Sequence, residues 1–399
     1  MQRNHPPPHH TNPSSPSPCR TTPATLARLA HPFRILVFDW DGTAVAHRTE
    51  DAAPVRQRIE LLLRRGVFIA VISGTSVQNI DRQLSASILG PHKQRLYLCT
   101  NRGSEVYGFD AHSHLVLLWR RIATPTENRL LTAAANAVQR AIQARTGLSI
   151  RLISNRLNRR KIDLIPEPAW ADPPKSAIGL LLAAVEGRLR SAGLTGGLNE
   201  AFTLAVRAAR EFGLCDARIT SDVKHIEIGL TDKGDSVAWV MEHLAAPHRI
   251  PPSDILLAGD ELGPTAGFPG SDARMLIPAA RGAVVISVGP EPGGTPPGVI
   301  HLGGGPSCFR AVLDLQIAAH PAAGAAPDPP ASNSPPEPDW LLIEEHDTPA
   351  REHEIESLFA LANGYVGTRG TVQEHTILAE PGTYLAGVYT GSAAEPAGS

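Results

Sequence analysis

RILVFDWDGTAV, residues 34–45, places two carboxylates directly behind a run of apolar residues. The run itself, residues 34–38, suits a strand of a parallel sheet, because such strands are buried on both faces and are apolar throughout. Asp39 and Asp41 stand where this strand should end, with a glycine and a threonine behind them. A buried charge without a partner is costly, so the pair marks a candidate site.

Strands and helices alternate after this stretch. A helical pattern over residues 53–66 is followed by a second apolar run, 67–73, which we expect to be a buried strand. A helix that begins at Thr75 or Ser76 and a third strand at 95–99 continue the alternation. The order strand, helix, strand, helix, strand predicts an α/β domain with a parallel sheet.

The pattern changes after residue 102. We expect residues 103–230 to form an α+β insertion, because the α/β alternation resumes only over 231–318. The core would then consist of residues 32–102 and 231–318. The elements expected in the insertion are hairpin strands at 104–110 and 114–120, helices near 125–146, 174–192 and 198–211, and strands near 149–153, 157–165, 217–222 and 225–230.

The two ends of the chain differ in composition from the middle. Residues 1–31 lack the apolar stretch of a secretory signal and are rich in proline, histidine and serine, which indicates a disordered tail. Residues 319–339 are rich in proline and alanine and indicate a linker with some polyproline stiffness. A further segment, residues 340–399, follows the linker.

Charge and cysteine content argue against several classes of protein. Lys plus Arg is 37 and Asp plus Glu is 39, a net charge of −2, so nothing favours a nucleic-acid partner. No apolar stretch approaches the roughly 18 residues of a membrane span. The four cysteines are far apart and form no CxxC pair. We therefore expect a cytoplasmic protein with reduced cysteines and no zinc knuckle.

Polar residues end three of the expected core strands. Asp39 and Asp41 follow the first strand, Ser73 and Gly74 end the second, and Asp260 follows a later one. In open α/β sheets the active site lies at the carboxyl ends of the strands, so these residues predict one convergent site. Each motif alone is weak evidence, because the same residue types are common in turns and caps.

The set of groups suits phosphoryl transfer. One carboxylate can attack phosphorus and form an aspartyl-phosphate. A second carboxylate two residues on can protonate the leaving oxygen and then deprotonate water. Several carboxylates can lie together where a hard cation joins them, and Mg²⁺ with oxygen ligands fits best. A hydroxyl and a lysine would hold the phosphoryl oxygens.

Four short motifs, DWDGT, SGT, KGD and GDE, occur in the order seen in the haloacid dehalogenase superfamily of phosphatases, which the chain resembles over about 34–315. The resemblance implies a Rossmann-like core and an Mg²⁺-dependent phosphatase. It implies the following site residues: Asp39 as nucleophile and metal ligand, Asp41 as general acid, general base and metal ligand, Ser73, Gly74 and Lys233 at the phosphate, and Asp260 at the metal.

The fourth motif departs from the family pattern. This branch usually carries GDxxxD or GDDxTD, whereas here Asp260 and Glu261 are followed by the next acid only at Asp272. Glu261 can supply the second carboxylate, or Asp272 can return on the loop. We prefer Asp260 with Glu261 as the metal-binding pair. If neither acid reached the metal, the chain would bind phosphate without efficient turnover.

The insertion lies between the second and third motifs and resembles the type-two cap of the branch with trehalose-6-phosphate phosphatases, sucrose phosphatases and phosphomannomutases. The stretch NRGSEVYGFD, beginning at Asn101, is similar to the segment that enters that cap. Such a cap closes over the substrate, excludes water and recognises the leaving group.

A basic cluster in the insertion could reach a sugar phosphate, and a solvated strand face is the alternative interpretation. Strand alternation would separate two of its members, Arg159 and Lys161, from Arg160. His225 and Glu227 are interpreted as surface or hinge positions. The full cluster is Arg151, Arg156, Arg159, Arg160 and Lys161.

The C-terminal segment carries a second resemblance. Its stretches NGY at 363–365 and GTRG at 367–370 are similar to the start of glycoside hydrolase family 65, which contains maltose, trehalose and kojibiose phosphorylases. In that family this start belongs to an N-terminal β-sandwich, and the catalytic acid lies in a later barrel. We expect only a partial sandwich from residues 340–399, with no phosphorylase activity and a strand edge that could mediate self-association.

These observations predict an Mg²⁺-dependent sugar-phosphate phosphatase that acts on trehalose 6-phosphate or a hexose phosphate, in disaccharide metabolism. The expected partner is a small-molecule sugar phosphate, with neither nucleic acid nor membrane involved. The alternatives are a phosphosugar mutase of the same fold and a non-catalytic module that senses a phosphosugar for the fused phosphorylase. Turnover that depends on metal would separate an enzyme from a sensor.

Overall fold

The computed structural model describes residues 19, 21–171, 177–265 and 267–321, and the backbone of three short strands further on. The chain divides into two compact units, residues 1–324 and 325–399. Within the described ranges, no helix is long and apolar enough to cross a membrane.

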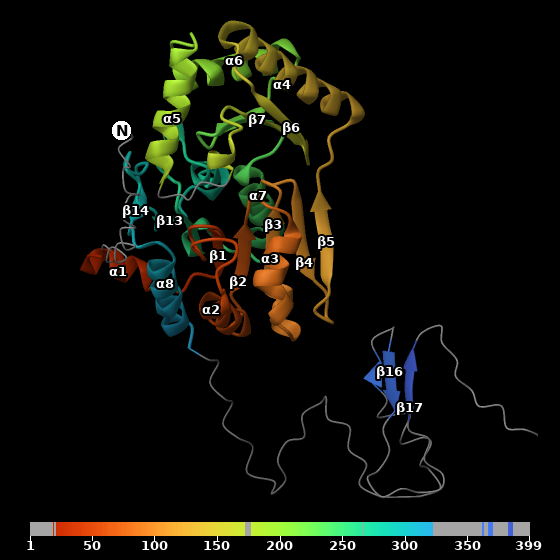
Figure 1. Ribbon diagram of the computed structural model, residues 1–399. Coiled ribbons are helices and arrows are strands. Elements are labelled where there is room, and N and C mark those ends of the chain that lie inside the picture. The colour runs from red at the N-terminus through yellow and green to blue at the C-terminus, as the bar shows by residue number, and fades with distance from the viewer. Residues whose placement is uncertain are drawn as a thin grey trace, which may run out of the picture. The chain divides into compact units, whose positions relative to one another are not determined.

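An eight-stranded sheet forms the centre of the first unit (Figure 1). β1 pairs in parallel with β10 on one side and with β2 on the other. β4 and β5 extend the sheet antiparallel beyond β3. In order across the sheet the strands are β14 (Val299–His301), β13 (Val284–Ser287), β10 (Ile255–Gly259), β1 (Ile35–Asp39), β2 (Phe68–Ile72), β3 (Leu96–Thr100), β4 (Glu105–Phe109) and β5 (Leu115–Arg120).

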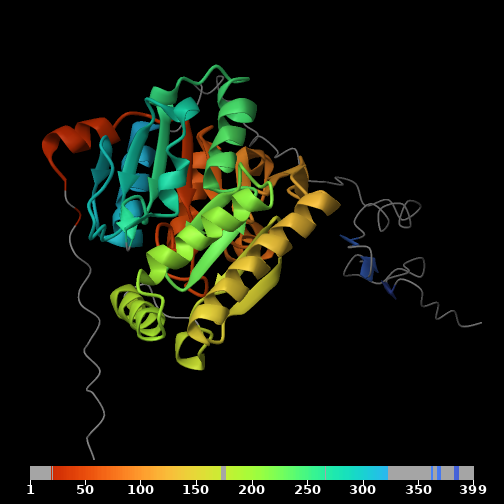
Figure 2. The same cartoon turned by 90° about the horizontal axis from the view of Figure 1, so that it is seen from above.

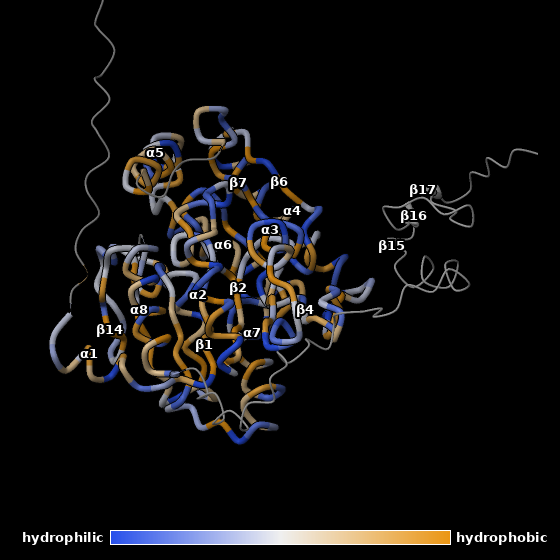
Figure 3. Tube along the Cα trace, turned by 90° about the horizontal axis from the view of Figure 1, so that it is seen from below, coloured by the Kyte–Doolittle hydropathy of each residue, from blue (hydrophilic) through white to orange (hydrophobic). Residues whose placement is uncertain are grey.

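Helices cover both faces of this sheet. α2 (Ala53–Arg64) and α8 (Gly305–Ala319) share one hydrophobic cluster with Leu36 and Phe38 of β1. The alternate residues of β1, Ile35 and Val37, belong to a second cluster with α7 (Lys233–Val240). Because successive side chains of a strand point to opposite faces, β1 is buried on both sides, as the sequence predicts. Figure 3 shows β1 and β2 in the hydrophobic interior.

The α/β fold with a mostly parallel sheet is thus confirmed. α3 (Val77–Gln83) follows β2, as expected for a helix that begins near Ser76. Because β1 pairs in parallel with both β2 and β10, the carboxyl ends of these three strands lie on the same edge of the sheet, which is where the candidate residues lie.

A second layer of structure stands above the core sheet in Figure 1, and Figure 2 looks down on it. Its four strands are antiparallel in the order β6 (Arg151–Arg156), β7 (Arg159–Asp163), β9 (His225–Gly229) and β8 (Arg218–Ser221). Its helices are α4 (Pro125–Thr146), α5 (Ile178–Ser191) and α6 (Gly197–Glu211), which share one hydrophobic cluster with the strands. We call this layer, residues 123–230, the cap.

Local sequence explains where the longest cap helix begins and ends. Thr124 and Glu127 form a capping box at the start of α4, and Pro125 occupies its first turn. Gly147 ends the helix in the left-handed conformation, with φ of 69°.

The hairpin expected at 104–110 and 114–120 is real, but its place differs from our prediction. β4 and β5 belong to the core sheet, because β4 pairs with β3 from Leu98 to Thr100. The expected boundary at residue 103 is therefore wrong, and the cap begins after β5. The apolar pattern of the two strands is the same in either sheet, so the sequence could not distinguish the two positions.

Ordered structure also begins before residue 32, where we expected the core to start. α1 (Pro23–Leu29) lies in the expected tail and buries Leu29. The buried side chain of Gln316 holds this end of the chain to α8: its Nε2 donates to the Leu29 carbonyl at 2.6 Å and its Oε1 accepts from the Phe33 amide at 3.0 Å. Most of the expected tail and linker lies outside the described residues.

A disulfide joins Cys19 to Cys308 of α8, with their Cα atoms 5.6 Å apart. The expectation of reduced cysteines is wrong for this pair, because sequence spacing does not reveal that the tail returns to α8. Cys99 and Cys215 are free thiols.

The described part of the second unit is a small antiparallel sheet. Its strands are β15 (Leu361–Ala362), β16 (Val366–Arg369) and β17 (Gly382–Leu385). The rest of the predicted partial sandwich lies outside the described residues.

Candidate active site

Two carboxylates meet at the carboxyl ends of neighbouring strands. Asp39 is the last residue of β1, and Asp260 follows the last residue of β10. The register Phe38↔Ala258 brings them side by side. The chain turns behind Asp39 through Gly42, whose φ of 96° suits glycine. This turn lets Thr43 donate its hydroxyl to Asp260 Oδ1 at 3.3 Å.

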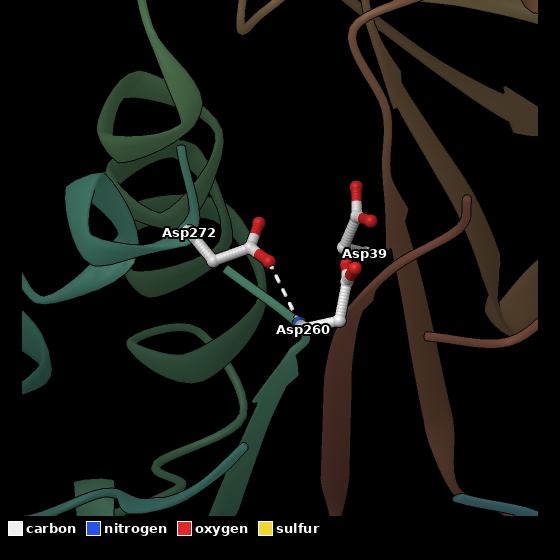
Figure 4. A group of neighbouring side chains, drawn as sticks. All are labelled: Asp39, Asp260 and Asp272. Carbon is white, nitrogen blue, oxygen red and sulfur yellow. Dashed lines mark hydrogen bonds between the residues drawn. The ribbon is translucent and has the colours of Figure 1, made fainter. Parts of the chain in front are cut away.

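A third carboxylate, Asp272, completes a buried cluster (Figure 4). Asp39, Asp260 and Asp272 are at most 6% exposed, and one carboxylate oxygen from each lies within 4.8 Å of the others. Asp272 Oδ2 accepts from the backbone amides of Asp260 and Glu261, each at 2.9 Å. These bonds fix the third carboxylate against the end of β10.

Lys233 places one cation in this cluster. Its Nζ donates to Asp39 Oδ1 at 2.7 Å and to Asp272 Oδ1 at 2.5 Å. Burial alone would lower the pKa of Lys233, but Asp272 and Asp39 outweigh it and raise the pKa above its ordinary value. The side chain therefore remains an ammonium group, and three carboxylates against one ammonium leave the cluster negative.

The preference for Glu261 as the second acid of the fourth motif is not supported. Glu261 does not belong to the three-carboxylate cluster, and its Oε2 accepts from the Ser271 hydroxyl at 2.8 Å. Asp272, the alternative, lies in the cluster. The loop between Asp260 and Asp272 folds back through the short hairpin of β11 (Pro264–Thr265) and β12 (Phe268–Pro269), a return that residue spacing alone does not reveal.

The donor set of the cluster fits a magnesium ion. Carboxylate oxygens are the ligands that Mg²⁺ prefers, and the excess of negative charge in a buried place favours a cation. Asp39, Asp260 and Asp272 would hold such an ion. Asp41, also expected as a ligand, is not a member of the cluster but lines the cavity next to it.

The phosphate-binding residues expected on β2 lie beside the cluster. Ser73 follows Ile72 at the end of that strand and is 1% exposed. Its hydroxyl accepts from the Thr75 amide at 3.3 Å, which holds the loop that contains Gly74. Ser73, Gly74 and Lys233 line one cavity together with Asp39 and Asp41, so the structure brings the predicted residues together.

This cavity, of about 400 Å³, lies between the core and the cap. Both contribute charged and polar side chains to its walls, so it suits a hydrophilic ligand rather than an apolar one. The lining includes the core residues Asp39, Asp41, Ser73, Gly74, Arg102, Lys233 and Glu261 and the cap residues Arg156, Arg159, Lys161, Asp222 and Glu227.

Glu227 lies among three cations on the cap side of the cavity. It is 2% exposed, and its carboxylate lies 2.8 Å from Lys161 Nζ, 3.3 Å from Arg102 Nε and 3.7 Å from Arg159 Nε. Burial would raise the pKa of Glu227, but Arg102, Lys161 and Arg159 outweigh it and lower the pKa below its ordinary value. Its interpretation as a surface or hinge residue was wrong.

Strand alternation in β7 acts as predicted. Arg159 and Lys161 line the cavity, whereas Arg160 points to α4 and donates from Nε to the Thr132 hydroxyl at 3.0 Å. Burial lowers the pKa of Arg159 to about 10, and Glu227 opposes this shift only in part. Arg159 Nη2 donates to the carbonyl of Gly74 at 2.9 Å, so the cap contacts the phosphate-binding loop directly.

Sequence reasoning missed Arg102. It follows Asn101 after β3, and both residues adopt left-handed backbone conformations with φ near 50°. Such conformations are strained for non-glycine residues and are typical of functional sites. The Arg102 side chain reaches the cap, where Nη1 donates to the Thr220 hydroxyl at 3.0 Å. The stretch that begins at Asn101 was singled out as the entry to the cap, but it gave Arg102 no role at the site.

Comparison with known proteins confirms the resemblance of the C-terminal segment. The family model of the glycosyl hydrolase family 65 N-terminal domain matches residues 342–398. No curated protein matches the chain.

Solved structures similar to the chain include a nucleotidase and a phosphatase. An N-terminally truncated IMP-nucleotidase of Plasmodium falciparum, with IMP bound, has a TM-score of 0.49 and 11% identity over 73% of this chain and 71% of that chain. A trehalose-6-phosphate phosphatase of Aspergillus fumigatus has a TM-score of 0.46 and 12% identity over 76% of this chain and 99% of that chain. Structural similarity at this level of identity does not assign the chain to a family.

Proposed function

We propose that the chain is an Mg²⁺-dependent phosphatase of the haloacid dehalogenase type that hydrolyses a sugar phosphate. The observation that carries the proposal is the buried cluster of Asp39, Asp260 and Asp272 around Lys233, open to a cavity that Ser73 also lines. Nucleophile, cation site and phosphate-binding groups are then present in one place, as phosphoryl transfer requires.

In the first half of the reaction, a carboxylate oxygen of Asp39 attacks phosphorus and the ester P–O bond breaks. Asp41 gives its proton to the departing sugar oxygen, so the products are an aspartyl-phosphate and the free sugar hydroxyl. In the second half, Asp41 takes a proton from water, whose oxygen attacks phosphorus and releases inorganic phosphate from Asp39. A bound Mg²⁺ ion would supply positive charge to the phosphoryl oxygens.

Ser73 and Lys233 hold the phosphoryl group during both steps. The Ser73 hydroxyl and the backbone amides beside it offer hydrogen-bond donors, and the Lys233 ammonium offers a full charge. Because Lys233 already contacts Asp39 at 2.7 Å, it also holds the nucleophile in place before the substrate arrives.

The cap side of the cavity supports a sugar as the leaving group. Lys161 and Arg159 offer donors and Glu227 offers an acceptor, a mixture that suits the many hydroxyl groups of a sugar. The glycoside hydrolase family 65 match in the same chain links the phosphatase to disaccharide metabolism by association. Trehalose 6-phosphate or a hexose phosphate is accordingly the proposed substrate, and the cap is proposed to be of the second type.

The non-catalytic alternative depended on an incomplete fourth motif. Because Asp272 lies in the cluster where a second acid was expected, that argument loses its support. A mutase of the same fold would use the same groups and would differ in returning phosphate to sugar faster than to water.

Phosphate release from a panel of sugar phosphates, including trehalose 6-phosphate and glucose 1-phosphate, tests the proposal. We expect release from one or two of them, lost when EDTA removes Mg²⁺ and recovered when Mg²⁺ is added back. Release that is unaffected by EDTA would contradict the metal role. Transfer to a second sugar without release of phosphate would establish the mutase instead.

A further inference from the structure

The unusual spacing of the fourth motif leaves one feature that the proposed reaction does not use. Between Asp260 and Asp272 the chain forms the β11–β12 hairpin, and Phe268 lies in its second strand. Both ends of this loop therefore carry carboxylates of the buried cluster. Contacts made by the middle of the loop can therefore affect the positions of Asp260 and Asp272.

Phe268 packs into the cap rather than into the core. Its ring stacks at a tilt on Phe202 of α6, with the ring centroids 4.6 Å apart. Phe268 is 8% exposed and belongs to the hydrophobic cluster of the cap, whose other buried members all lie in residues 131–230. A ring buried in this way is a strong anchor, because aromatic side chains bury large areas and gain from pairing.

The path from Phe268 to Asp272 is short and held by hydrogen bonds. Within it, the Gly270 amide donates to the Gly263 carbonyl at 3.1 Å, and the Asp272 amide donates to the Glu261 carbonyl at 3.0 Å. Gly270 packs so closely that a Cβ at this position would overlap the Glu261 carbonyl oxygen. A displacement of Phe268 would thus be transmitted over four residues to the Asp272 carboxylate.

A second contact lies just beyond Asp272. Arg274 donates from Nη2 to the Ile219 carbonyl of β8 in the cap at 3.2 Å. Asp272 is therefore flanked by two attachments to the cap, one apolar and one polar, while its own side chain binds the core at Asp260 and Lys233.

We propose that Phe268 is a positioning residue through which the docking of the cap on the core fixes Asp272 in the metal site. When Phe268 is seated against Phe202, the loop holds Asp272 against Asp260. When the cap is displaced, the loop loses its anchor and Asp272 is held only by its bonds to the core, so its carboxylate is positioned less firmly for the metal. Metal affinity and cap docking are then coupled. This inference rests on the proposed metal role of the cluster.

Binding of Mn²⁺, followed by electron paramagnetic resonance, tests the proposal without relying on turnover. We expect Phe268→Ala to weaken Mn²⁺ binding by about tenfold or more, the range typical of residues that support metal ligands. Phe202→Ala should have the same effect, although Phe202 lies in a cap helix. Combined, the two changes should weaken binding little more than either alone, because each breaks the same contact.

Two further variants separate positioning from general destabilisation. Ile142→Ala removes a fully buried residue of the cap core in α4, and it should lower the unfolding midpoint while Mn²⁺ affinity stays within about threefold of wild type. Phe268→Tyr keeps the ring and should bind Mn²⁺ about as tightly as wild type. In activity assays, Phe268→Ala should raise the Mg²⁺ concentration needed for half activation far more than it lowers kcat at saturating Mg²⁺.

The outcomes are distinguishable from failure of the proposed function. If wild type binds Mn²⁺ and both Phe268→Ala and Phe202→Ala bind it equally well, the coupling is wrong and the phosphatase proposal stands. If Phe268→Ala does not fold, Phe202→Ala alone decides in the same way. If wild type itself binds no Mn²⁺, the metal role of the cluster fails, and the coupling fails with it.

Discussion

Two charged clusters in the cavity have opposite compositions. On the core side one cation, Lys233, lies among three carboxylates. On the cap side three cations surround Glu227, and one of them, Lys161, also lies 3.5 Å from Asp222, so cations outnumber carboxylates there. Each cluster keeps an excess of one sign in a place that is mostly removed from water. The negative excess suits a divalent cation and the positive excess suits a phosphorylated substrate, in agreement with the roles that we propose for the two walls.

The clusters also differ in how the chain builds them. The core cluster uses strand ends and the loop behind β10, where sequence motifs mark the residues. The cap cluster uses positions within β7 and β9, paired as Lys161↔Glu227, together with one strained arginine from the core. A polar residue directly after an apolar strand indicates a site at the edge of the sheet. A polar residue within a strand is harder to interpret, because polar and apolar residues alternate in any strand with one exposed face.

Removing the nucleophile tests the core cluster most severely. Asp39→Asn should lower the rate of phosphate release by at least about a thousandfold, because no other step replaces the covalent one. The amide keeps the shape of the side chain, so the fold should persist, which circular dichroism would check. Activity within tenfold of wild type would contradict the proposed mechanism.

A pair of variants sharpens the assignment of the fourth motif. Asp272→Asn should raise the Mg²⁺ concentration for half activation by about ten- to a hundredfold, because it removes a carboxylate of the metal site. Glu261→Gln should change it by less than about threefold, because Glu261 lies outside the cluster. The opposite ranking would restore Glu261 as the metal ligand.

The charge balance of the cap cluster should contribute to the free energy of unfolding. Glu227→Gln removes the buried carboxylate that three cations share, although Lys161 also lies 3.5 Å from Asp222. It should cost about 3 kcal/mol in the free energy of unfolding at pH 7. Urea unfolding would measure this. Arg64→Gln, which removes the exposed partner of a surface pair with Glu60, should cost less than about 1 kcal/mol and serves as a control.

The difference in unfolding free energy between wild type and Glu227→Gln should depend on pH. The pKa of Glu227 is lowered on folding, so its contribution is present above the unfolded value of about 4.3 and is lost as pH falls through the folded value. The stability gap between wild type and Glu227→Gln should therefore narrow below about pH 4. A gap that stays constant down to pH 3 would contradict the proposed charge balance.

Sequence reasoning located most of the core site and little of the cap site. Asp39, Asp41, Ser73 and Lys233 were predicted, and the structure brings them to one cavity. Arg102 lies in a stretch that the sequence analysis singled out, but its role was missed, because its partners Glu227 and Thr220 are more than a hundred residues away in the chain.

By itself, the sequence determined the α/β core, the position of its strand ends and the presence of a second resemblance in residues 340–399. These follow from local patterns, since apolar runs form buried strands and polar residues then collect at the strand ends. Only the tertiary structure decided that β4 and β5 join the core sheet, that Cys19 pairs with Cys308 and that Asp272 lies beside Asp39 and Asp260. Each of these depends on where a distant segment returns in space, which is decided by packing between segments rather than by residues along them.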